Sequence, residues 1–394
     1  MNREIYADRP ELEKELRRAL DGSLHAIVFG ESGSGKSWLY KKVLGDMKAQ
    51  VATANCANAL RFGSLTDEIR HVIEGEDPKR LASIEEEMSA TAKIVVAEGG
   101  LKSKRTYDFA TLDPLLECFK ILRSKAGKRS AVLVIDNLEM IFASVQIMEE
   151  LASIITLLDD SRYAQYNVKL LVVGVPADVK DYFSRTHASV ANRVSEISEV
   201  SSLSETQVAS IVERGFVNLL QVSIDPVLLQ QWQNHIFEVT MGFAQPVQEY
   251  CEQLAFVAED VSWNTTIINL EDADNQWLKK GLGQASATIA LLMNERETKI
   301  GRRNQVLYAL GRINKRVFHV SEIETILRVE FPASTDGITL AVGQLLSELS
   351  GGNTPIIKAS AKGPTYEFRD ARFAMALRVL LQKDIVKEKI TKLG

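Results

Sequence analysis

Cysteine is scarce in this sequence. Its three cysteines, Cys56, Cys118 and Cys251, are too few and too widely spaced for a disulfide framework or a zinc site, so we expect free thiols in a reducing compartment. Long hydrophobic runs are also missing, because runs such as AVLVI at 131–135 are far too short to cross a bilayer. The start of the chain is charged and lacks a secretory core. These absences predict a cytoplasmic protein that uses no membrane.

The overall composition is that of a globular protein, but its charge is divided unevenly. The chain has 394 residues, 45% hydrophobic and 25% charged, and is long enough for two or three domains. Residues 296–394 contain 17 Lys+Arg and 10 Asp+Glu, a net charge of +7, which leaves −12 for residues 1–295. A basic tail indicates either an anionic partner or a domain that docks on its own acidic body.

The first half of the chain alternates strand and helix patterns. Residues 24–29, 131–137 and 168–175 have the continuous apolar character of buried strands. Helix patterns separate them, and strands that alternate with helices imply a parallel α/β sheet. The expected helices in this half are 10–20, 35–47, 64–74, 78–92, 112–125 and 145–159.

The second half changes character after about residue 200. Three helix patterns, 203–216, 225–237 and 245–259, begin with a cap or a proline and predict a small helical domain, followed by a helical connector over 260–295. Beyond it we expect three helices (302–313, 320–331 and 337–350), a hairpin with strands 356–360 and 365–368, and a last helix from about Asp370.

One motif carries specific chemistry. Residues 30–37, GESGSGKS, satisfy the phosphate-loop (Walker A) pattern GxxxxGK[ST] between a predicted strand and a predicted helix. Its glycines let backbone N–H groups turn toward a polyphosphate, Lys36 reaches the β/γ oxygens, and Ser37 offers a hydroxyl to Mg²⁺. The alternative is a glycine-rich turn without a ligand. The expected nucleotide-binding residues are Gly30, Glu31, Ser32, Gly33, Ser34, Gly35, Lys36, Ser37 and Trp38.

The metal should have a second protein partner at the end of a buried strand. Asp136 closes the strand AVLVID, where a carboxylate is costly without a cation or hydrogen-bond donors nearby. We therefore expect Ser37 and Asp136 to be the magnesium ligands, although Asp136 as a simple strand-end cap also fits.

The order of these features resembles a known family. A YADRPEL opening (6–12), GESGSGKS, VLVIDNLE, LLVVGVP, ANRV, a helical lid and a winged-helix-like tail resemble the AAA+ ATPases of the replication-initiator and origin-recognition type. Signalling ATPases of the STAND class and transposition-regulator ATPases are similar. The resemblance implies ATP and Mg²⁺ as cofactors, Tyr6 and Arg9 near the adenine, and Arg193 as an arginine finger that reaches a neighbouring subunit. A surface arginine in a salt bridge is the alternative for Arg193.

The sequence also departs from the family pattern. Asn137 stands where the family has a glutamate that orients the attacking water, and an amide cannot take a proton; Glu139 is the next acid. Gly174-Val175-Pro176 offers no polar γ-phosphate sensor, and the lid helix at 242–248 lacks a sensor arginine. Weak sensors suggest a switch that holds ATP and hydrolyses it slowly.

Lys36 and Asp136 are 100 residues apart, more than a minimal core of this kind requires. Part of 60–110 therefore reads as an insertion. Its basic piece, LKSKR at 101–105, is either a solvated loop or a contact to nucleic acid or a partner.

The sequence of the tail leaves open whether this domain binds DNA. In DNA-binding winged helices the third helix carries basic residues to base edges, but Gly337 to Ser350 has no Lys or Arg and contains Glu348. Non-specific phosphate contacts and contacts to protein alone both remain open. The basic groups left for phosphates are Lys358 and Lys362 in the hairpin and Lys383, Lys387, Lys389 and Lys392 in the predicted last helix.

Together these features predict an α/β P-loop NTPase core at 1–200, a helical lid at 201–262, a helical connector at 263–300 and a winged-helix-like domain at 301–394. The expected function is an ATPase (a hydrolase) that switches with its nucleotide and assembles as a homo-oligomer or with a partner ATPase or effector. DNA-linked work in replication, transposition or defence is one hypothesis, and a STAND-like scaffold that recruits an effector without DNA is the other. The expected catalytic residues are Lys36, Asp136, Asn137, Glu139 and Arg193.

Overall fold

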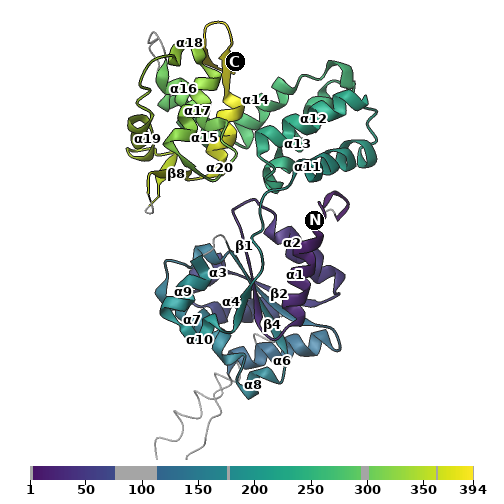
Figure 1. Ribbon diagram of the computed structural model, residues 1–394. Coiled ribbons are helices and arrows are strands. Elements are labelled where there is room, and N and C mark those ends of the chain that lie inside the picture. The colour runs from purple at the N-terminus through teal and green to yellow at the C-terminus, as the bar shows by residue number, and fades with distance from the viewer. Residues whose placement is uncertain (1–2, 76–112, 175–177, 294–300, 361–362, 394) are drawn as a thin grey trace, which may run out of the picture. The chain divides into compact units, whose positions relative to one another are not determined.

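The computed structural model describes residues 3–75, 113–174, 178–293, 301–360 and 363–393 (Figure 1). The chain forms two compact units: the first is Arg9–Ser201, and the second combines Asn2–Asp8 with Ser202–Gly394. The predicted helix at 78–92 and the basic piece at 101–105 lie outside the described residues. None of the helices in the described ranges has the length and hydropathy needed to span a membrane.

A five-stranded sheet forms the centre of the first unit. Its strand order is β2-β3-β4-β1-β5, and every neighbouring pair is parallel, which confirms the predicted α/β class. The two edge strands were not predicted, since β2 contains alternating polar residues and β5 has only three residues. The strands are β1 (His25–Phe29), β2 (Gln50–Asn55), β3 (Ala131–Asp136), β4 (Val168–Gly174) and β5 (Val194–Glu196).

Helices cover both faces of this sheet, as α/β architecture requires. Alternate strand residues point to opposite sides: Val28 and Val134 face a core shared with α1 (Pro10–Asp21) and α2 (Lys36–Asp46). Ile27 and Ile135 face the other core. Figure 1 shows α1 and α2 on one side of the sheet and α3, α4, α7 and α9 on the other. The remaining helices of this unit are α3 (Cys56–Phe62), α4 (Leu65–Glu74), α6 (Pro114–Ala126), α7 (Val145–Leu157), α8 (Ser161–Ala164), α9 (Asp178–Thr186) and α10 (Ala188–Ala191).

The second unit begins with the three predicted helices. Ser204 forms a capping box with Gln207 at the start of α11, and the Asp225 carboxylate caps α12 just before Pro226, so local capping explains both boundaries. The connector is helical, as predicted. The elements are α11 (Glu205–Glu213), the π-helical turn η3 (Arg214–Leu219), α12 (Pro226–Thr240), α13 (Ala244–Asp260), η4 (Thr265–Ile267), α14 (Leu270–Lys280) and α15 (Gly283–Leu292).

Up to Leu380, the described residues of the tail form a helix, a strand, three helices, a two-stranded hairpin and a further helix in that order. The three strands pair antiparallel in the order β6-β8-β7. The helix that corresponds to the third predicted one begins at Val342, later than the predicted Gly337. The elements are α16 (Arg302–Gly311), β6 (Val317–His319), α17 (Val320–Glu330), α18 (Pro332–Thr335), α19 (Val342–Ser350), β7 (Ile357–Ala359), β8 (Thr365–Phe368) and α20 (Ala371–Leu380).

The predicted end of the last helix is wrong. Helix α20 stops at Leu380, and the chain continues as an antiparallel hairpin, β9 (Leu381–Asp384) and β10 (Lys389–Lys392). The Asp384 carboxylate accepts the backbone N–H groups of Val386 and Lys387, each at 3.0 Å, a local turn that competes with helix. Lys383, Lys387, Lys389 and Lys392 therefore lie on a hairpin and its turn, whereas Lys362 lies outside the described residues.

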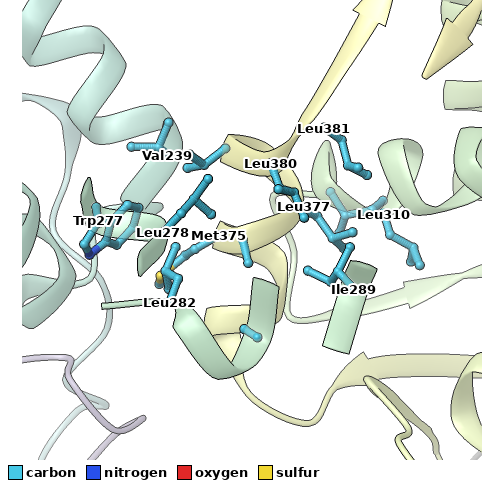
Figure 2. Close-up of a cluster of buried hydrophobic side chains, with 14 of the residues drawn as sticks. Val239, Trp277, Leu278, Leu282, Ile289, Leu310, Met375, Leu377, Leu380 and Leu381 are labelled. Atoms are coloured by element: carbon cyan, nitrogen blue, oxygen red, sulfur yellow. The ribbon is translucent and has the colours of Figure 1, made fainter. Parts of the chain in front are cut away.

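The helical region and the tail share one hydrophobic core, and Figure 2 shows Leu278 of the helical region beside Met375 of the tail within it. Their charges are also complementary, since residues 202–295 contain 12 Asp+Glu and only 3 Lys+Arg. Arg372 of the tail binds both oxygens of Glu249 at 3.1 and 2.8 Å, and Arg312 pairs with Glu238. The basic tail is thus used, in part, to dock on the protein's own acidic helices.

Candidate nucleotide-binding site

The phosphate loop lies between β1 and α2, at the carboxyl end of β1. Gly30, Gly33 and Gly35 have positive φ angles of 153°, 78° and 98°, which side chains disfavour. A Cβ at Gly30 would lie 2.4 Å from the Val200 carbonyl oxygen. Glycine is therefore required for the curl of the backbone, and a strand–loop–helix turn of this kind is suited to a polyphosphate.

Lys36 opens helix α2 and folds back over the loop. Its Nζ donates to the carbonyl oxygens of Gly30 at 2.8 Å and Glu31 at 2.9 Å. Burial lowers the pKa of the Lys36 amine, and the nearby negative charges of Glu139, Asp136 and Glu31 oppose that shift. The lysine therefore lies within the field of both acids, Asp136 and Glu139, that the sequence assigned to this site.

Asp136 is held in place at the end of β3. Its Oδ2 accepts the hydroxyl of Tyr40 at 3.0 Å, and its Oδ1 accepts the backbone N–H of Asn137 at 2.9 Å. Burial, together with the charge of Asp136, raises the pKa of the Tyr40 phenol, so that it remains a donor. One helix, α2, thus supplies the lysine, Ser37 and the residue that orients the acid.

Asn137 and Glu139 follow in a tight turn. Asn137 has a left-handed conformation with φ 61°, and Glu139 lies in the 3₁₀ turn η2 (Leu138–Met140). The charge of Glu139 acts on Lys36 and also on Cys56, whose thiol pKa is raised to about 12 by burial and then by Glu139, Asp136 and Glu68. The left-handed conformation of Asn137 therefore reverses the chain, so that the charge of Glu139 acts on Lys36 of the phosphate loop.

Arg9 is buried against the phosphate loop. Its guanidinium donates to the Ser34 carbonyl at 2.8 Å and to the Ser201 carbonyl at 2.9 Å. Tyr6, by contrast, is buried in the second unit, where its carbonyl accepts a hydrogen bond from Arg214. Of the two residues that the family resemblance placed near the adenine, Arg9 is the one that contacts the loop.

Arg193 is not brought to the phosphate loop of its own chain. Its carbonyl accepts the N–H of His25 at the start of β1, at the opposite edge of the sheet. The side chain forms an ion pair with Asp159 at 2.6 Å and donates to the Ser189 carbonyl at 2.6 Å. Any role at a phosphate is therefore on a neighbouring chain.

Sequence reasoning missed three residues at this edge of the sheet. Tyr40 carries no motif signal, and Asn55 and Glu68 are brought in by strand β2, which was not predicted. Asn55 pairs in register with Asp136, and its N–H donates to the buried Glu68 carboxylate at 2.9 Å. A recognised β2 is the signal that would have located both.

The residues present fit a nucleotide with magnesium. The loop backbone curls at three glycines with positive φ, and the buried Ser34 hydroxyl has no hydrogen-bond partner among the described residues. Ser37 and Asp136 offer a hydroxyl and a carboxylate, and Mg²⁺ is commonly held by one or two protein ligands together with phosphate oxygens and water.

Residues 18–183 match the family described as AAA domain. We call this matched segment the AAA domain. The match begins before β1 and ends in α9, so it contains the phosphate loop, Asp136 and Glu139 of the site above. The AAA+ resemblance read from the sequence is confirmed. No curated protein matches the chain.

Solved structures resemble the chain along most of its length. A Walker-type ATPase of Pyrococcus abyssi is 18% identical, with a TM-score of 0.54 over 95% of this chain and 97% of that one. Cdc6p of Pyrobaculum aerophilum is 14% identical (TM-score 0.42, 95% of each chain). The ORC2 protein of Aeropyrum pernix in its ADP form is 12% identical (TM-score 0.48, 94% and 93%). The first of these likenesses supports the fold of the chain both inside and outside residues 18–183.

Proposed function

We propose that this protein is a slow, magnesium-dependent ATPase of the AAA+ type that works as a nucleotide-dependent switch and assembles with protein partners. One observation carries the proposal: the glycine loop, Lys36, Asp136 and Glu139 converge at the carboxyl edge of the sheet within the AAA domain. A second unit with its own core follows the domain, as a switch that reports to a partner requires.

Each residue then has a defined task. The loop amides and the Lys36 ammonium neutralise the β- and γ-phosphates, and the start of α2 adds the positive end of its dipole. Ser37 and Asp136 hold Mg²⁺, which when bound polarises the phosphoryl oxygens. Tyr40 and the Asn137 N–H fix the orientation of the Asp136 carboxylate, so that it meets the metal without rearrangement.

Slow hydrolysis follows from the turn after β3. Asn137 orients water but accepts no proton, so Glu139, whose charge reaches Lys36, takes the proton from the attacking water. Arg193 completes the site from a neighbouring chain by exchanging its ion pair with Asp159 for the γ-phosphate of that chain. An incomplete site in the single chain couples turnover to assembly.

The nucleotide state is transmitted through the loop itself. Val200 N–H bonds to the Phe29 carbonyl, and Arg9 ties the loop residue Ser34 to Ser201. Asp8–Arg9 and Ser201–Ser202 are the peptide links between the two units. Both links therefore start at residues that are fixed by the phosphate loop.

We assign the parts of the second unit as a lid at 201–262, a connector at 263–300 and a winged-helix domain at 301–394 that contacts protein. Helix α19 has no Lys or Arg, and its Glu348 is paired with Arg303 at 2.6 Å, which disfavours base reading. A DNA-associated switch is the second candidate, favoured by the exposed Lys387 and Lys392 of the C-terminal hairpin. The three free cysteines agree with a cytoplasmic location.

The test is a Lys36→Ala variant beside wild type. We expect the variant to lose ATP binding, measured by calorimetry with Mg²⁺, while its circular dichroism stays unchanged. Tight ATP binding by the variant contradicts the site assignment. ATPase activity measured across protein concentrations, with and without DNA, then separates the candidates: the proposed function requires turnover that rises with assembly, and DNA stimulation selects the second.

A further inference from the structure

The C-terminal hairpin ends in an exposed apolar tip. Ile385 and Val386 are 81% and 93% exposed, the highest values among large hydrophobic side chains in the described part of the chain. Lysines surround them on β9, β10 and the turn. We call Ile385 and Val386, with Lys383, Lys387, Lys389 and Lys392, the hairpin surface. Adjacent aliphatic side chains this exposed on a soluble unit mark a contact site more often than a lone surface residue does.

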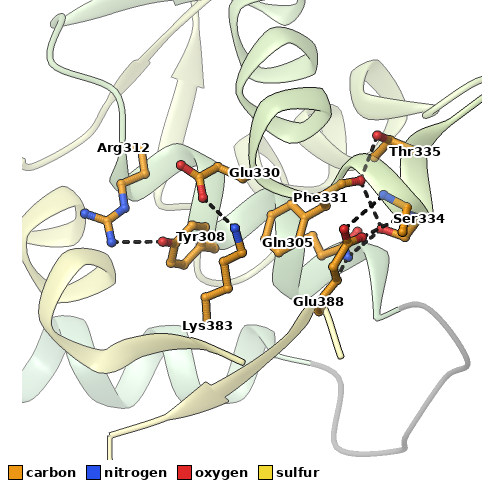
Figure 3. A network of polar contacts seen from close by, with 10 residues as sticks. Gln305, Tyr308, Arg312, Glu330, Phe331, Ser334, Thr335, Lys383 and Glu388 are labelled. Carbon is orange, nitrogen blue, oxygen red and sulfur yellow. Dashed lines mark hydrogen bonds and ion pairs between the residues drawn. The ribbon is translucent and has the colours of Figure 1, made fainter. Parts of the chain in front are cut away.

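The tip is anchored firmly (Figure 3). The Glu388 carboxylate accepts the N–H groups of Ala333 and Ser334, each at 2.9 Å, at the start of α18. Gln305 donates to the Glu388 carbonyl at 3.0 Å, and Lys383 pairs with Glu330 at 2.8 Å. The hairpin therefore presents Ile385 and Val386 in a preformed geometry, which lowers the entropy cost of binding.

An open groove borders the tip at Ile385. The groove has a volume of about 640 Å³ and a mostly polar lining, and its other aliphatic residues are Leu270, Val379, Leu381 and Leu393. It lies wholly within the second unit.

A second exposed apolar surface lies in the same unit. The loops 219–227 and 259–268 are joined by a hydrogen bond from Thr265 Oγ1 to the Ser223 carbonyl at 3.3 Å. Val227 and Ile267 are 67% and 62% exposed, and these loops contain no Lys or Arg. We call this the loop surface; its exposed apolar residues are Leu219, Leu220, Val227, Trp263 and Ile267, and its exposed acids are Asp225, Glu259 and Asp260.

The two surfaces are complementary, and neither is covered by the described residues of the second unit. The hairpin surface is apolar with a lysine rim, whereas the loop surface is apolar with an acidic rim. We propose that the hairpin surface of one copy binds the loop surface of a second copy of this chain. Such a contact joins different patches on the two copies. It deepens the assembly part of the proposed function, but it uses neither the AAA domain nor ATP.

The first test removes the apolar tip. An Ile385→Ser/Val386→Ser double variant is compared with Leu291→Ser, a control at a side chain that is equally exposed but lies outside both surfaces. Sedimentation velocity of nucleotide-free protein at about 50 mM salt should show self-association weakened by about tenfold or more in the double variant and unchanged in the control. A wild-type protein that stays monomeric at high concentration, or a tip variant that associates normally, overturns the proposal.

The second test reverses charge. Lys387→Glu/Lys392→Glu should weaken self-association, as should Glu259→Lys/Asp260→Lys, because each places like charges across the contact. A chain that carries all four changes has both rims inverted and should associate like wild type again. Failure of this rescue overturns the assigned pairing, since a general loss of solubility or folding would not be repaired by two further changes.

The third comparison tests whether the hairpin surface binds DNA or lipid instead of a second copy, and whether self-association depends on the proposed ATP site. If the tip variant loses binding to duplex DNA or to acidic lipid vesicles while self-association is unchanged, the hairpin surface belongs to that partner and the proposal fails. Lys36→Ala should self-associate like wild type in nucleotide-free solution. The proposed contact is therefore tested separately from the proposed ATP site, and the experiments can contradict either proposal without the other.

Discussion

At the scale of single residues, Arg9 connects the phosphate loop to the end of the first unit. It is a buried arginine, and two of its side-chain hydrogen bonds go to backbone carbonyls, one in the phosphate loop and one at the end of the first unit. A buried carbonyl that loses its donor costs about 1–3 kcal/mol. We therefore expect Arg9 to stabilise the conformation of the phosphate loop.

We predict that Arg9→Gln weakens ATP binding by about tenfold or more, because a shorter neutral side chain leaves the Ser34 and Ser201 carbonyls without donors. Arg9→Lys, which keeps the charge but reaches one carbonyl at most, should give an intermediate affinity. Isothermal calorimetry with MgATP measures both. Equal affinity of wild type and Arg9→Gln would assign Arg9 a role elsewhere.

His25 predicts how the first unit responds to acid. Its Nδ1 accepts the N–H of Leu170 at 3.2 Å, and burial, with a smaller contribution from Lys169, lowers its pKa from 6.5 to about 4. The unfolded chain takes up this proton below pH 6.5, but the folded chain does so only near pH 4. The first unit therefore loses stability as pH falls through that window.

At pH 4.5 the loss due to His25 should be about 2–3 kcal/mol. A His25→Gln variant keeps an acceptor for Leu170 but has no titrating ring, so its stability should fall less between pH 7.5 and 4.5. Urea unfolding followed by circular dichroism at both pH values measures the difference. Parallel losses in the two proteins would mean that other groups carry the acid response.

At the scale of elements, we expect the turn η2 to set the rate of the proposed ATP hydrolysis. Glu139→Gln removes the one carboxylate in this turn whose charge reaches Lys36. We expect kcat to fall by about 100-fold with ATP affinity nearly unchanged, measured by steady-state phosphate release and by calorimetry. A normal kcat in Glu139→Gln would show that another group accepts the proton.

Asn137→Glu gives the family's usual residue at the adjacent position. We predict a higher kcat if water orientation limits the rate, reduced by a cost of about 1 kcal/mol because a glutamate replaces asparagine at φ 61°. The same phosphate-release assay measures it. An unchanged or lower rate would leave proton transfer with Glu139.

The contact between α20 and α13 is a second element-scale prediction. Arg372 binds both oxygens of Glu249 and the Gly281 carbonyl, and burial is incomplete for both side chains. Arg372→Met should lower the stability of the second unit by about 1–3 kcal/mol while Lys36-dependent ATP binding persists. Urea unfolding read by tryptophan fluorescence follows it, since Trp232, Trp263 and Trp277 all lie in that unit. An unchanged unfolding transition would show that the Arg372–Glu249 ion pair does not contribute to stability.

The elements also show what the sequence was able to predict. Strands β1, β3 and β4 are continuous apolar runs buried on both faces, and the phosphate loop and Asp136 sit at their ends, so pattern and motif located them. Strand β2 is an edge strand with alternating polar residues, so the apolar pattern predicted neither the strand nor the positions of Asn55 and Glu68. The hairpin β9–β10 was mistaken for helix because Lys383 to Lys392 read as a charged helical face, and only the Asp384 turn and the Glu388 anchor reveal the reversal.

At the scale of the whole molecule, charge is mostly satisfied internally. The acidic helices and the basic tail meet through Arg312 and Arg372, so part of the tail's net charge of +7 is balanced within the chain. Within the tail, several further cations pair with nearby carboxylates; these are Arg303, Lys315, Arg316, Lys358 and Lys383.

We therefore predict weak, non-specific DNA binding at most. Few phosphates would be neutralised, so the slope of log affinity against log salt should be shallower than about −3. Fluorescence anisotropy with a labelled duplex from about 50 to 300 mM salt, with and without ATP, measures it. A steep slope or a clear sequence preference would support the DNA-associated candidate.

The path of the first residues has a practical consequence for dissecting this protein. Ala7 lies in the hydrophobic core of the second unit, and Arg214 holds the Tyr6 carbonyl and the Asp8 carboxylate. A fragment that starts at Ser202 would expose that core and leave Arg214 without these acceptors. Two well-folded halves thus require residues 2–8 to be grafted onto the C-terminal half, or both pieces to be co-expressed from one cut near Ser202.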